Sequence, residues 1–171
     1  MVKKNACVFI SGKGTNLKNL IFKSREYNFP INIKLVVSND KNSLGIIFAK
    51  KNSIPYRIVN TNSRIFETKL INVLRDYNIS LICLAGYMKI VSKKFLLGYG
   101  KKIINIHPSL LPKFKGLNTY SKVLKFKEKK TGCTVHYVNE KLDNGKTIVK
   151  KRVLINKYDD VEILKKKVQS E

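Results

Sequence analysis

Short apolar runs alternate with helically spaced apolar residues along much of the chain, and this alternation constrains the fold more than any other feature. Uninterrupted apolar runs predict buried strands at residues 5–10, 31–37, 56–59, 81–85 and 102–105. Apolar residues at helical spacing predict helices around residues 17–21, 44–48 and 66–77. Strands that alternate with helices in this way form βαβ units. The sequence therefore predicts an α/β fold with a mostly parallel, Rossmann-like sheet and helices on both faces.

The pattern changes after Pro112. A helix is predicted near residues 119–126, and two strand-like segments follow at residues 133–138 and 147–154. The turn-forming string Asp143-Asn144-Gly145 lies between these segments, so we expect an antiparallel hairpin near the C-terminus. A last amphipathic helix begins near Asp159. Because no repeat or low-complexity linker interrupts the chain, we expect a single domain over residues 1–171.

Composition narrows the class of protein. The chain has 171 residues, of which 43% are apolar, which suits one globular domain. No apolar run approaches the roughly 20 residues that a membrane span needs, and the N-terminus lacks the pattern of a signal peptide. The cysteines, Cys7, Cys83 and Cys133, have no regular spacing, which argues against a disulfide framework or a zinc site. We expect a cytoplasmic protein without a metal and without a membrane partner.

The formal net charge of +24 raises the possibility of nucleic-acid binding. The lysines, however, are scattered through every segment, and no basic stripe interleaved with aromatic residues stands out. We interpret them as a solvated surface that attracts phosphorylated small molecules, and expect no specific nucleic-acid partner. A basic nucleic-acid binding module stays open as an alternative function.

A glycine-containing loop, Ser11-Gly12-Lys13-Gly14-Thr15-Asn16, joins the first predicted strand to the first predicted helix. Glycines allow close approach of the backbone, and a helix N-terminus offers free N–H groups, so the loop suits a phosphate. It matches neither a Walker loop nor a dinucleotide fingerprint. The alternative is a plain turn in which Thr15 or Asn16 caps the helix.

Candidate catalytic residues occur together in the string Asn105-Ile106-His107-Pro108. Residues two apart on an extended chain point to the same side, so Asn105 and His107 can converge on one reacting atom. The amide can donate to a developing oxyanion, and the imidazole can donate a proton. Asp143 is the candidate carboxylate that would favour the imidazolium, although local sequence alone favours a turn residue bonded to its own main chain. The second histidine, His136, is expected to be a partly buried sheet residue and not a catalyst.

These residues resemble the signature of the folate-dependent formyltransferase family. The matching strings are Asn105-Ile106-His107-Pro108-Ser109-Leu110-Leu111-Pro112, Phe114-Lys115-Gly116, Ser11-Gly12-Lys13-Gly14-Thr15-Asn16-Leu17, Leu84-Ala85-Gly86-Tyr87-Met88-Lys89-Ile90, Thr131-Gly132-Cys133-Thr134-Val135-His136-Tyr137 and Leu142-Asp143-Asn144-Gly145. They cover essentially the whole chain in one order. The first glycine loop narrows the resemblance to the branch that formylates glycinamide ribonucleotide in purine biosynthesis.

The resemblance implies an enzyme that transfers the formyl group of 10-formyltetrahydrofolate, its co-substrate, to the amine of glycinamide ribonucleotide. Asn105 would stabilise the oxyanion and His107 would donate the proton. Asp143 would favour the charged histidine and organise proton transfer. The partners implied are these small molecules, and the chain would be a monomer or a homodimer.

The resemblance also implies two sets of binding residues. The substrate phosphate would be held by Gly14, Thr15 and Asn16. The folate would contact Asn105 and the segment Met88, Lys89, Ile90 and Val91, largely through backbone groups. Arg64 would lie near the folate tail, where its guanidinium suits a carboxylate.

Three departures from the family pattern bear on function. Tyr120 stands where many members have a histidine after Gly116, and Asn144 replaces a small residue in the turn. The chain also looks short at its C-terminus, where Glu171 falls one position from a substrate-binding glutamate of the family. An inactive relic of the formyltransferase therefore stays open as an alternative. A formyltetrahydrofolate deformylase, which shares the histidine-proline block, is a second alternative. A methionyl-tRNA formyltransferase is a further relative, but it would need a C-terminal tRNA-binding domain that 171 residues are not expected to supply.

Overall fold

The structure is a computed structural model that describes residues 2–171, and it divides into two compact units. The first unit ends at Ile104, and the second runs from Asn105 to Glu171. The strand β5 (Lys102–His107) crosses from one unit into the other. Each unit is described by itself. The organisation of the chain as a single domain stays a prediction.

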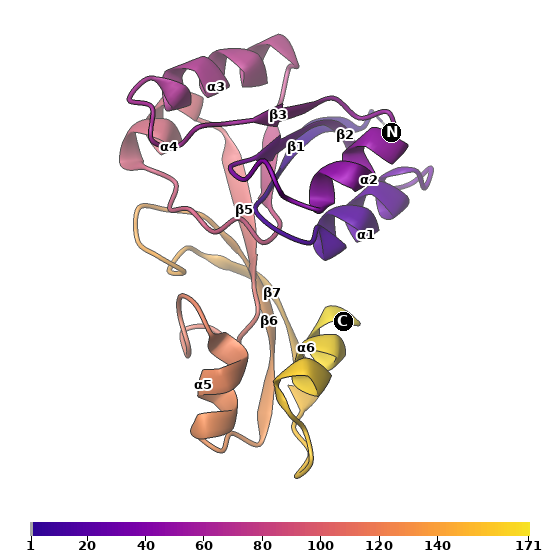
Figure 1. Cartoon of the computed structure of the whole chain (residues 1–171), viewed down its shortest axis with the longest axis vertical. Helices are drawn as coiled ribbons and strands as arrows, with labels where there is room; N and C mark the ends of the chain where they lie inside the picture. The colour runs from indigo at the N-terminus through magenta and orange to yellow at the C-terminus, as the bar shows by residue number, and fades with distance from the viewer. Residues whose placement is uncertain (1) are drawn as a thin grey trace. The chain divides into compact units, whose positions relative to one another are not determined.

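The first unit is built from βαβ units, as the alternating pattern predicts (Figure 1). Its elements before β5 are β1 (Lys4–Ile10), α1 (Thr15–Ser24), β2 (Ile31–Ser38), α2 (Gly45–Lys51), β3 (Tyr56–Ile58), α3 (Phe66–Asp76), β4 (Leu81–Leu84) and α4 (Lys93–Tyr99). β1 pairs in parallel with β2 and β4, and β2 pairs in parallel with β3. The strand order is β3-β2-β1-β4, so the predicted parallel sheet is confirmed.

Alternate residues of β1 face two separate layers of helices. Val8 belongs to a core cluster that includes Leu17 of α1 and Ile46 of α2. Phe9 points the other way, and its ring lies 6.1 Å from the ring of Phe95 in α4. Both faces of a parallel sheet must be covered because both carry apolar side chains. The prediction of helices on both faces is confirmed in this unit.

The helix α4 was not predicted from the apolar pattern, because Phe95, Leu96 and Leu97 are consecutive and do not show helical spacing. Its boundaries nevertheless carry clear signals. The Ser92 hydroxyl accepts a hydrogen bond from the Phe95 N–H at 3.0 Å, which is a side-chain N-cap. Gly100 ends the helix with a φ of 65°, in the left-handed region.

The second unit carries the hairpin expected near the C-terminus. Its elements after β5 are α5 (Thr119–Lys125), β6 (Lys130–Tyr137), β7 (Thr147–Leu154) and α6 (Val161–Gln169). β6 and β7 are antiparallel, so the predicted hairpin is confirmed. Val123 of α5, with Leu164 and Val168 of α6, is buried, which forms the apolar side of this unit.

One boundary near the candidate site differs from the sequence prediction. The strand β5 continues through His107, whereas the apolar run predicts an end at Asn105. The strand ends at His107 because Pro108 has no N–H to donate to a neighbouring strand. His107 therefore lies on a strand and not on the following loop.

Within residues 2–171, no helix has both the length and the apolar character needed to cross a membrane. The same residues contain no cluster of three or more histidine, cysteine, aspartate or glutamate side chains arranged to hold a metal ion.

Candidate active site

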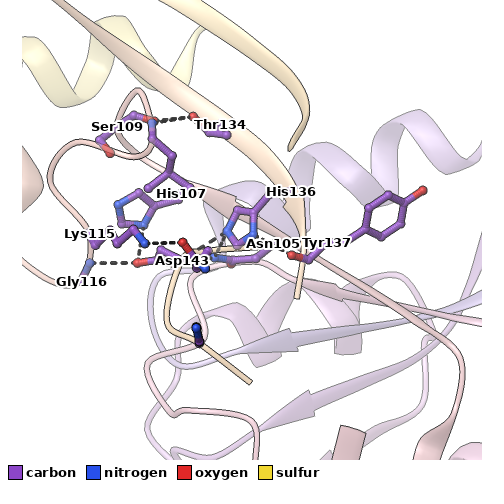
Figure 2. Close-up of polar contacts among 12 residues, drawn as sticks. Asn105, His107, Ser109, Lys115, Gly116, Thr134, His136, Tyr137 and Asp143 are labelled. Atoms are coloured by element: carbon purple, nitrogen blue, oxygen red, sulfur yellow. Dashed lines mark hydrogen bonds and ion pairs between the residues drawn. The ribbon is translucent and has the colours of Figure 1, made fainter. Parts of the chain in front are cut away.

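Four polar side chains of the second unit form one cluster (Figure 2). Asn105 and His107 come from β5, His136 comes from β6, and Asp143 comes from the turn between β6 and β7. The two histidines and the aspartate are buried, with 5%, 2% and 9% of their surface exposed. Buried polar groups are costly unless they are hydrogen-bonded, so the contacts inside the cluster decide its chemistry.

The carboxylate of Asp143 lies at the centre of this cluster, between the two imidazole rings (Figure 2). Its Oδ2 lies 3.3 Å from Nδ1 of His107 and accepts a hydrogen bond from the Gly116 N–H at 2.8 Å. Its Oδ1 accepts from the Asn105 amide at 3.4 Å and lies 3.7 Å from Nε2 of His136. Sequence alone could not place Asp143 beside His107, and the structure brings them together.

The pKa of Asp143 is lowered from its ordinary value. Burial acts in the opposite direction, because it penalises the charged carboxylate. The His136 ring, the N–H of Gly116 and the charge of His107 outweigh that penalty. The cluster therefore holds a buried carboxylate in its ionised form at neutral pH.

The orientation of the His107 ring is fixed by a main-chain carbonyl. Its Nε2 lies 2.9 Å from the oxygen of Phe114. A carbonyl oxygen can only accept, so Nε2 carries a proton and donates it. The other nitrogen, Nδ1, therefore faces Asp143, and a proton on it converts that contact into an ion pair.

His136 fixes the amide of Asn105. Its Nδ1 donates to the oxygen of Tyr137 at 2.8 Å, which fixes the orientation of the ring. The Nε2 of His136 lies 3.2 Å from the Asn105 amide nitrogen. The two hydrogens of the amide thus face His136 and Asp143, and the contact to Asp143 is the longer. An oxyanion can compete for the hydrogen that faces Asp143, because a stretched hydrogen bond is the weaker one.

The loop that follows His107 is held by two hydroxyl groups. Ser109 Oγ donates to the oxygen of Lys113 at 2.6 Å. Thr134 Oγ1 donates to the oxygen of Ser109 at 2.7 Å and accepts from the Leu111 N–H at 3.1 Å. The loop thereby presents the Phe114 carbonyl at a fixed position, which in turn fixes the His107 ring.

The turn that carries Asp143 depends on a glycine. A Cβ on Gly145 would lie 1.7 Å from the oxygen of Tyr137, so any side chain there collides with the backbone. Asp143 itself adopts a φ of 46°, in the left-handed region that aspartate tolerates better than most residues. The exposed Asn144 accepts a hydrogen bond from Lys115 at 2.7 Å, which joins this turn to the loop that contains Gly116.

In the first unit, the glycine loop after β1 leaves the N-terminus of α1 without a side-chain cap. Gly14, with a φ of 75°, is the N-cap residue, so the alternative in which Thr15 or Asn16 caps the helix is wrong. A Cβ on Gly14 would lie 2.4 Å from the Cα of Gly45, so the loop and the start of α2 touch through two glycines. The first N–H groups of α1 are therefore available to a ligand.

Two further segments of the first unit carry the predicted folate contacts. Met88 and Ile90 follow β4 and expose 64% and 75% of their surface. Arg64 is exposed in the turn before α3. Ser92 Oγ donates to Glu67 Oε2 at 2.7 Å, which ties the start of α4 to the start of α3. Exposed apolar side chains suit an aromatic body of a ligand, and an exposed guanidinium suits a carboxylate.

Comparison with known proteins identifies the family. The sequence pattern of the formyl transferase family matches residues 4–171. The chain belongs to the formyl transferase family. The phosphoribosylglycinamide formyltransferase of Haemophilus influenzae is 38% identical over 163 residues, which cover 93% of this chain and 77% of that protein. The predicted similarity to the phosphoribosylglycinamide formyltransferase branch is thereby confirmed.

A longer relative and a solved structure agree with this assignment. The bovine trifunctional purine biosynthetic protein adenosine-3 is 40% identical over 171 residues. The aligned region covers 98% of this chain but only 17% of that much longer protein. The crystal structure of phosphoribosylglycinamide formyltransferase from Anaplasma phagocytophilum matches with a TM-score of 0.92 and 36% identity. That match covers 99% of this chain and 80% of the other.

Three residues contribute to the polar cluster around Asp143 in ways that the sequence did not predict. His136 is a buried sheet residue, as expected, but its ring also orients Asn105 and contacts Asp143. Gly116 and Phe114 act through main-chain groups, which no side-chain pattern reveals. The only signal for these two residues was their position in the string Phe114-Lys115-Gly116.

Two departures from the formyl transferase pattern have a visible place in the second unit. Tyr120 is half-buried, and burial, with a smaller effect of Cys133, raises its pKa to about 12. It is therefore a neutral phenol at physiological pH, unable to supply the charge of a protonated histidine. Glu171 is exposed, and no substrate-binding role is assigned to it.

Proposed function

We propose that this chain transfers the formyl group of 10-formyltetrahydrofolate to the amine of glycinamide ribonucleotide, in de novo purine biosynthesis. One observation carries the proposal. In a chain that belongs to the formyl transferase family, Asp143 lies within 3.3 Å of His107 and 3.4 Å of Asn105. These are a buried carboxylate, an imidazole and an amide, which are suited to proton transfer and to oxyanion stabilisation in acyl transfer.

In the proposed reaction the amine nitrogen attacks the formyl carbon and a tetrahedral oxyanion forms. Asn105 donates its amide hydrogen to this oxygen, and the protonated His107 acts as the proton donor. The intermediate collapses as the bond from carbon to N10 of the folate breaks, and one proton passes from the attacking amine to N10. Loss of one such oxyanion donor typically costs about 10²–10³ in rate.

Asp143 organises the proton transfer in this proposal. Because its pKa is lowered, it is an anion at neutral pH and stabilises a proton on His107. The same carboxylate holds the Asn105 amide through its other oxygen. A single ionised group therefore supports both donors.

The binding roles follow the two exposed segments of the first unit. The uncapped N-terminus of α1, at Gly14, Thr15 and Asn16, binds the ribonucleotide phosphate through backbone N–H groups. The folate contacts Met88, Lys89, Ile90 and Val91 largely through main-chain groups, and Asn105 contacts its formyl group. Arg64 pairs with a carboxylate of the folate tail.

The proposal includes small-molecule partners, a monomer or a homodimer, and a cytoplasmic location. The three cysteines are free thiols, and all of them are buried. Free thiols are usual in a reducing compartment, which supports the location.

The test is an assay of the purified chain with 10-formyltetrahydrofolate and glycinamide ribonucleotide. We expect formylglycinamide ribonucleotide and tetrahydrofolate in equal amounts, measured by mass spectrometry and by absorbance. Formate release without any amine acceptor would instead indicate the deformylase reaction. A folded protein that forms neither product would indicate an inactive relic.

A further inference from the structure

Ser11 is the last residue before the glycine loop, directly after β1, and it contacts two other loops of the first unit. Its hydroxyl donates to Oδ1 of Asn39, which follows β2. The same hydroxyl accepts from the Met88 N–H at 2.8 Å, and the Ser11 N–H donates to the oxygen of Gly86 at 3.2 Å. Both Gly86 and Met88 follow β4. One serine therefore joins the loops at the carboxyl ends of three neighbouring parallel strands.

The chemistry of the contact requires a hydroxyl. The Ser11 oxygen donates one hydrogen bond and accepts one, so alanine at this position would leave both partners without their bond. Ser11 and Asn39 are half-buried, so water replaces these bonds only in part.

The glycine loop has a second anchor that does not involve Ser11. The oxygen of Gly12 accepts from Ser43 Oγ at 2.8 Å and from the Gly45 N–H at 3.0 Å. Ser43 therefore holds the glycine loop alone, whereas Ser11 holds the glycine loop and the segment after β4 together. This difference separates the roles of two serines that contact the same loop.

We propose that Ser11 is a positioning residue that fixes the phosphate-binding loop and the folate-binding segment to each other. The inference rests on the proposed function, because it assigns the two ligands to these segments. The hydrogen bonds of this hydroxyl to the described residues go to Asn39 and Met88. Loss of the hydroxyl is expected to weaken the binding of both substrates, since both segments lose the same anchor.

The experiment compares three serine-to-alanine variants. In Ser11→Ala we expect the KM values for both substrates to rise about 3–10-fold, with kcat within about twofold. The reason is that the variant binds the substrates and the transition state more weakly by the same amount. In Ser43→Ala we expect only the KM for glycinamide ribonucleotide to rise. Ser24→Ala, a matched change at the end of α1, is expected to leave both KM values within about twofold. Ser11→Thr keeps the hydroxyl and is expected to restore both KM values.

Amide hydrogen exchange supplies a readout that does not depend on turnover. In Ser11→Ala, the Met88 N–H loses its acceptor, so its exchange is expected to accelerate about tenfold, which corresponds to the loss of one hydrogen bond. In Ser43→Ala its exchange is expected to stay unchanged.

The outcomes separate the two proposals. Unchanged exchange of Met88 in Ser11→Ala, or a KM increase confined to one substrate, overturns the role of Ser11. If the wild-type chain forms no formylated product, the proposed function fails, and the exchange rate of Met88 alone then decides whether Ser11 holds the two segments. Parallel KM increases with faster Met88 exchange establish the positioning role.

Discussion

The candidate binding segments of the first unit and the polar cluster of the second unit are built in opposite ways. The binding segments are exposed, with Met88 and Ile90 largely open to solvent. They are held by main-chain bonds and by a few hydroxyl groups, as at Gly12 and Ser11. The cluster is buried, and side chains make most of its contacts. His107 and Asp143, for example, expose less than a tenth of their surface.

This difference follows from what each region has to do. A binding segment presents backbone N–H and C=O groups to a ligand, so the identity of its side chains matters less than the path of the chain. A catalytic group needs a defined protonation state and orientation, and both depend on specific neighbours. We therefore expect substitutions in the cluster to have large effects on the rate, and substitutions in the binding segments to have small effects on binding.

The largest expected effect is that of His107→Ala. We expect kcat to fall about 10³-fold, because the variant loses the proton donor and an oxyanion contact together. KM for both substrates should change little, since the proposed binding segments lie elsewhere in the chain. Steady-state kinetics with each substrate varied in turn measures the two effects.

The same variant can contradict the division of roles between the buried cluster and the exposed binding segments. Thermal melting must show that His107→Ala is folded, because its Nε2 bond to Phe114 is also lost. A folded variant with unchanged kcat removes His107 from the mechanism. A raised KM with an unchanged kcat would mean that the buried cluster contributes to substrate binding and not to the rate.

The second prediction compares one glycine from each region. Gly145→Ala places a Cβ 1.7 Å from a backbone oxygen, whereas a Cβ on Gly12 meets nothing within 4 Å. We expect Gly145→Ala to lower the free energy of unfolding by about 3 kcal/mol, because the turn that carries Asp143 must shift. Gly12→Ala, the matched control, should change it by less than about 1 kcal/mol. Urea unfolding followed by circular dichroism gives both values, and equal losses would show that the turn is as adaptable as the loop.

The fold could be predicted from the sequence to the extent that apolar periodicity determines it. The runs at residues 5–10 and 31–37 become β1 and β2 because a parallel sheet buries both faces. The helix α4 was not predicted because its apolar residues are consecutive and do not show helical spacing, although Ser92 and Gly100 mark its two ends. The end of β5 was predicted two residues early because His107 is polar, and a pattern of apolar residues does not reveal a buried polar residue on a strand.

The site could be predicted in part, for a different physical reason. Asn105 and His107 are two residues apart on one strand, so their common direction follows from local geometry. Asp143 lies far from them in sequence, and only the path of the β6–β7 hairpin brings its carboxylate to His107. The main-chain groups of Phe114 and Gly116 carry no residue-specific signal. Local geometry is therefore predictable, whereas contacts between distant segments need the fold.

The third prediction concerns the pH dependence of stability. The pKa of Asp143 is lower in the folded chain than its ordinary value, so its ionised form stabilises the fold. This contribution is fully present above the ordinary pKa of an aspartate and is lost as the pH falls through the lowered value. We expect the free energy of unfolding of the wild type to fall more steeply below about pH 4 than that of Asp143→Asn. Urea titrations at several pH values measure both slopes, and parallel curves would mean that the carboxylate gains nothing from its buried neighbours.

The smallest expected effect is that of Arg64→Ala in the first unit. Arg64 is exposed, and the pairing proposed for it is with a solvated carboxylate, so the loss should be about 1 kcal/mol or less. This corresponds to a rise of up to about fivefold in KM for 10-formyltetrahydrofolate, with kcat unchanged. The rise should shrink as salt is added, because exposed ion pairs are screened. Arg57→Ala removes another exposed arginine of the same unit and serves as the control, since its guanidinium contacts only the carbonyl of Tyr56 among the described residues. Equal effects of the two variants would reduce the role of Arg64 to general attraction by a lysine-rich surface, whereas a salt-sensitive rise confined to Arg64→Ala would establish it as a specific contact of the binding region.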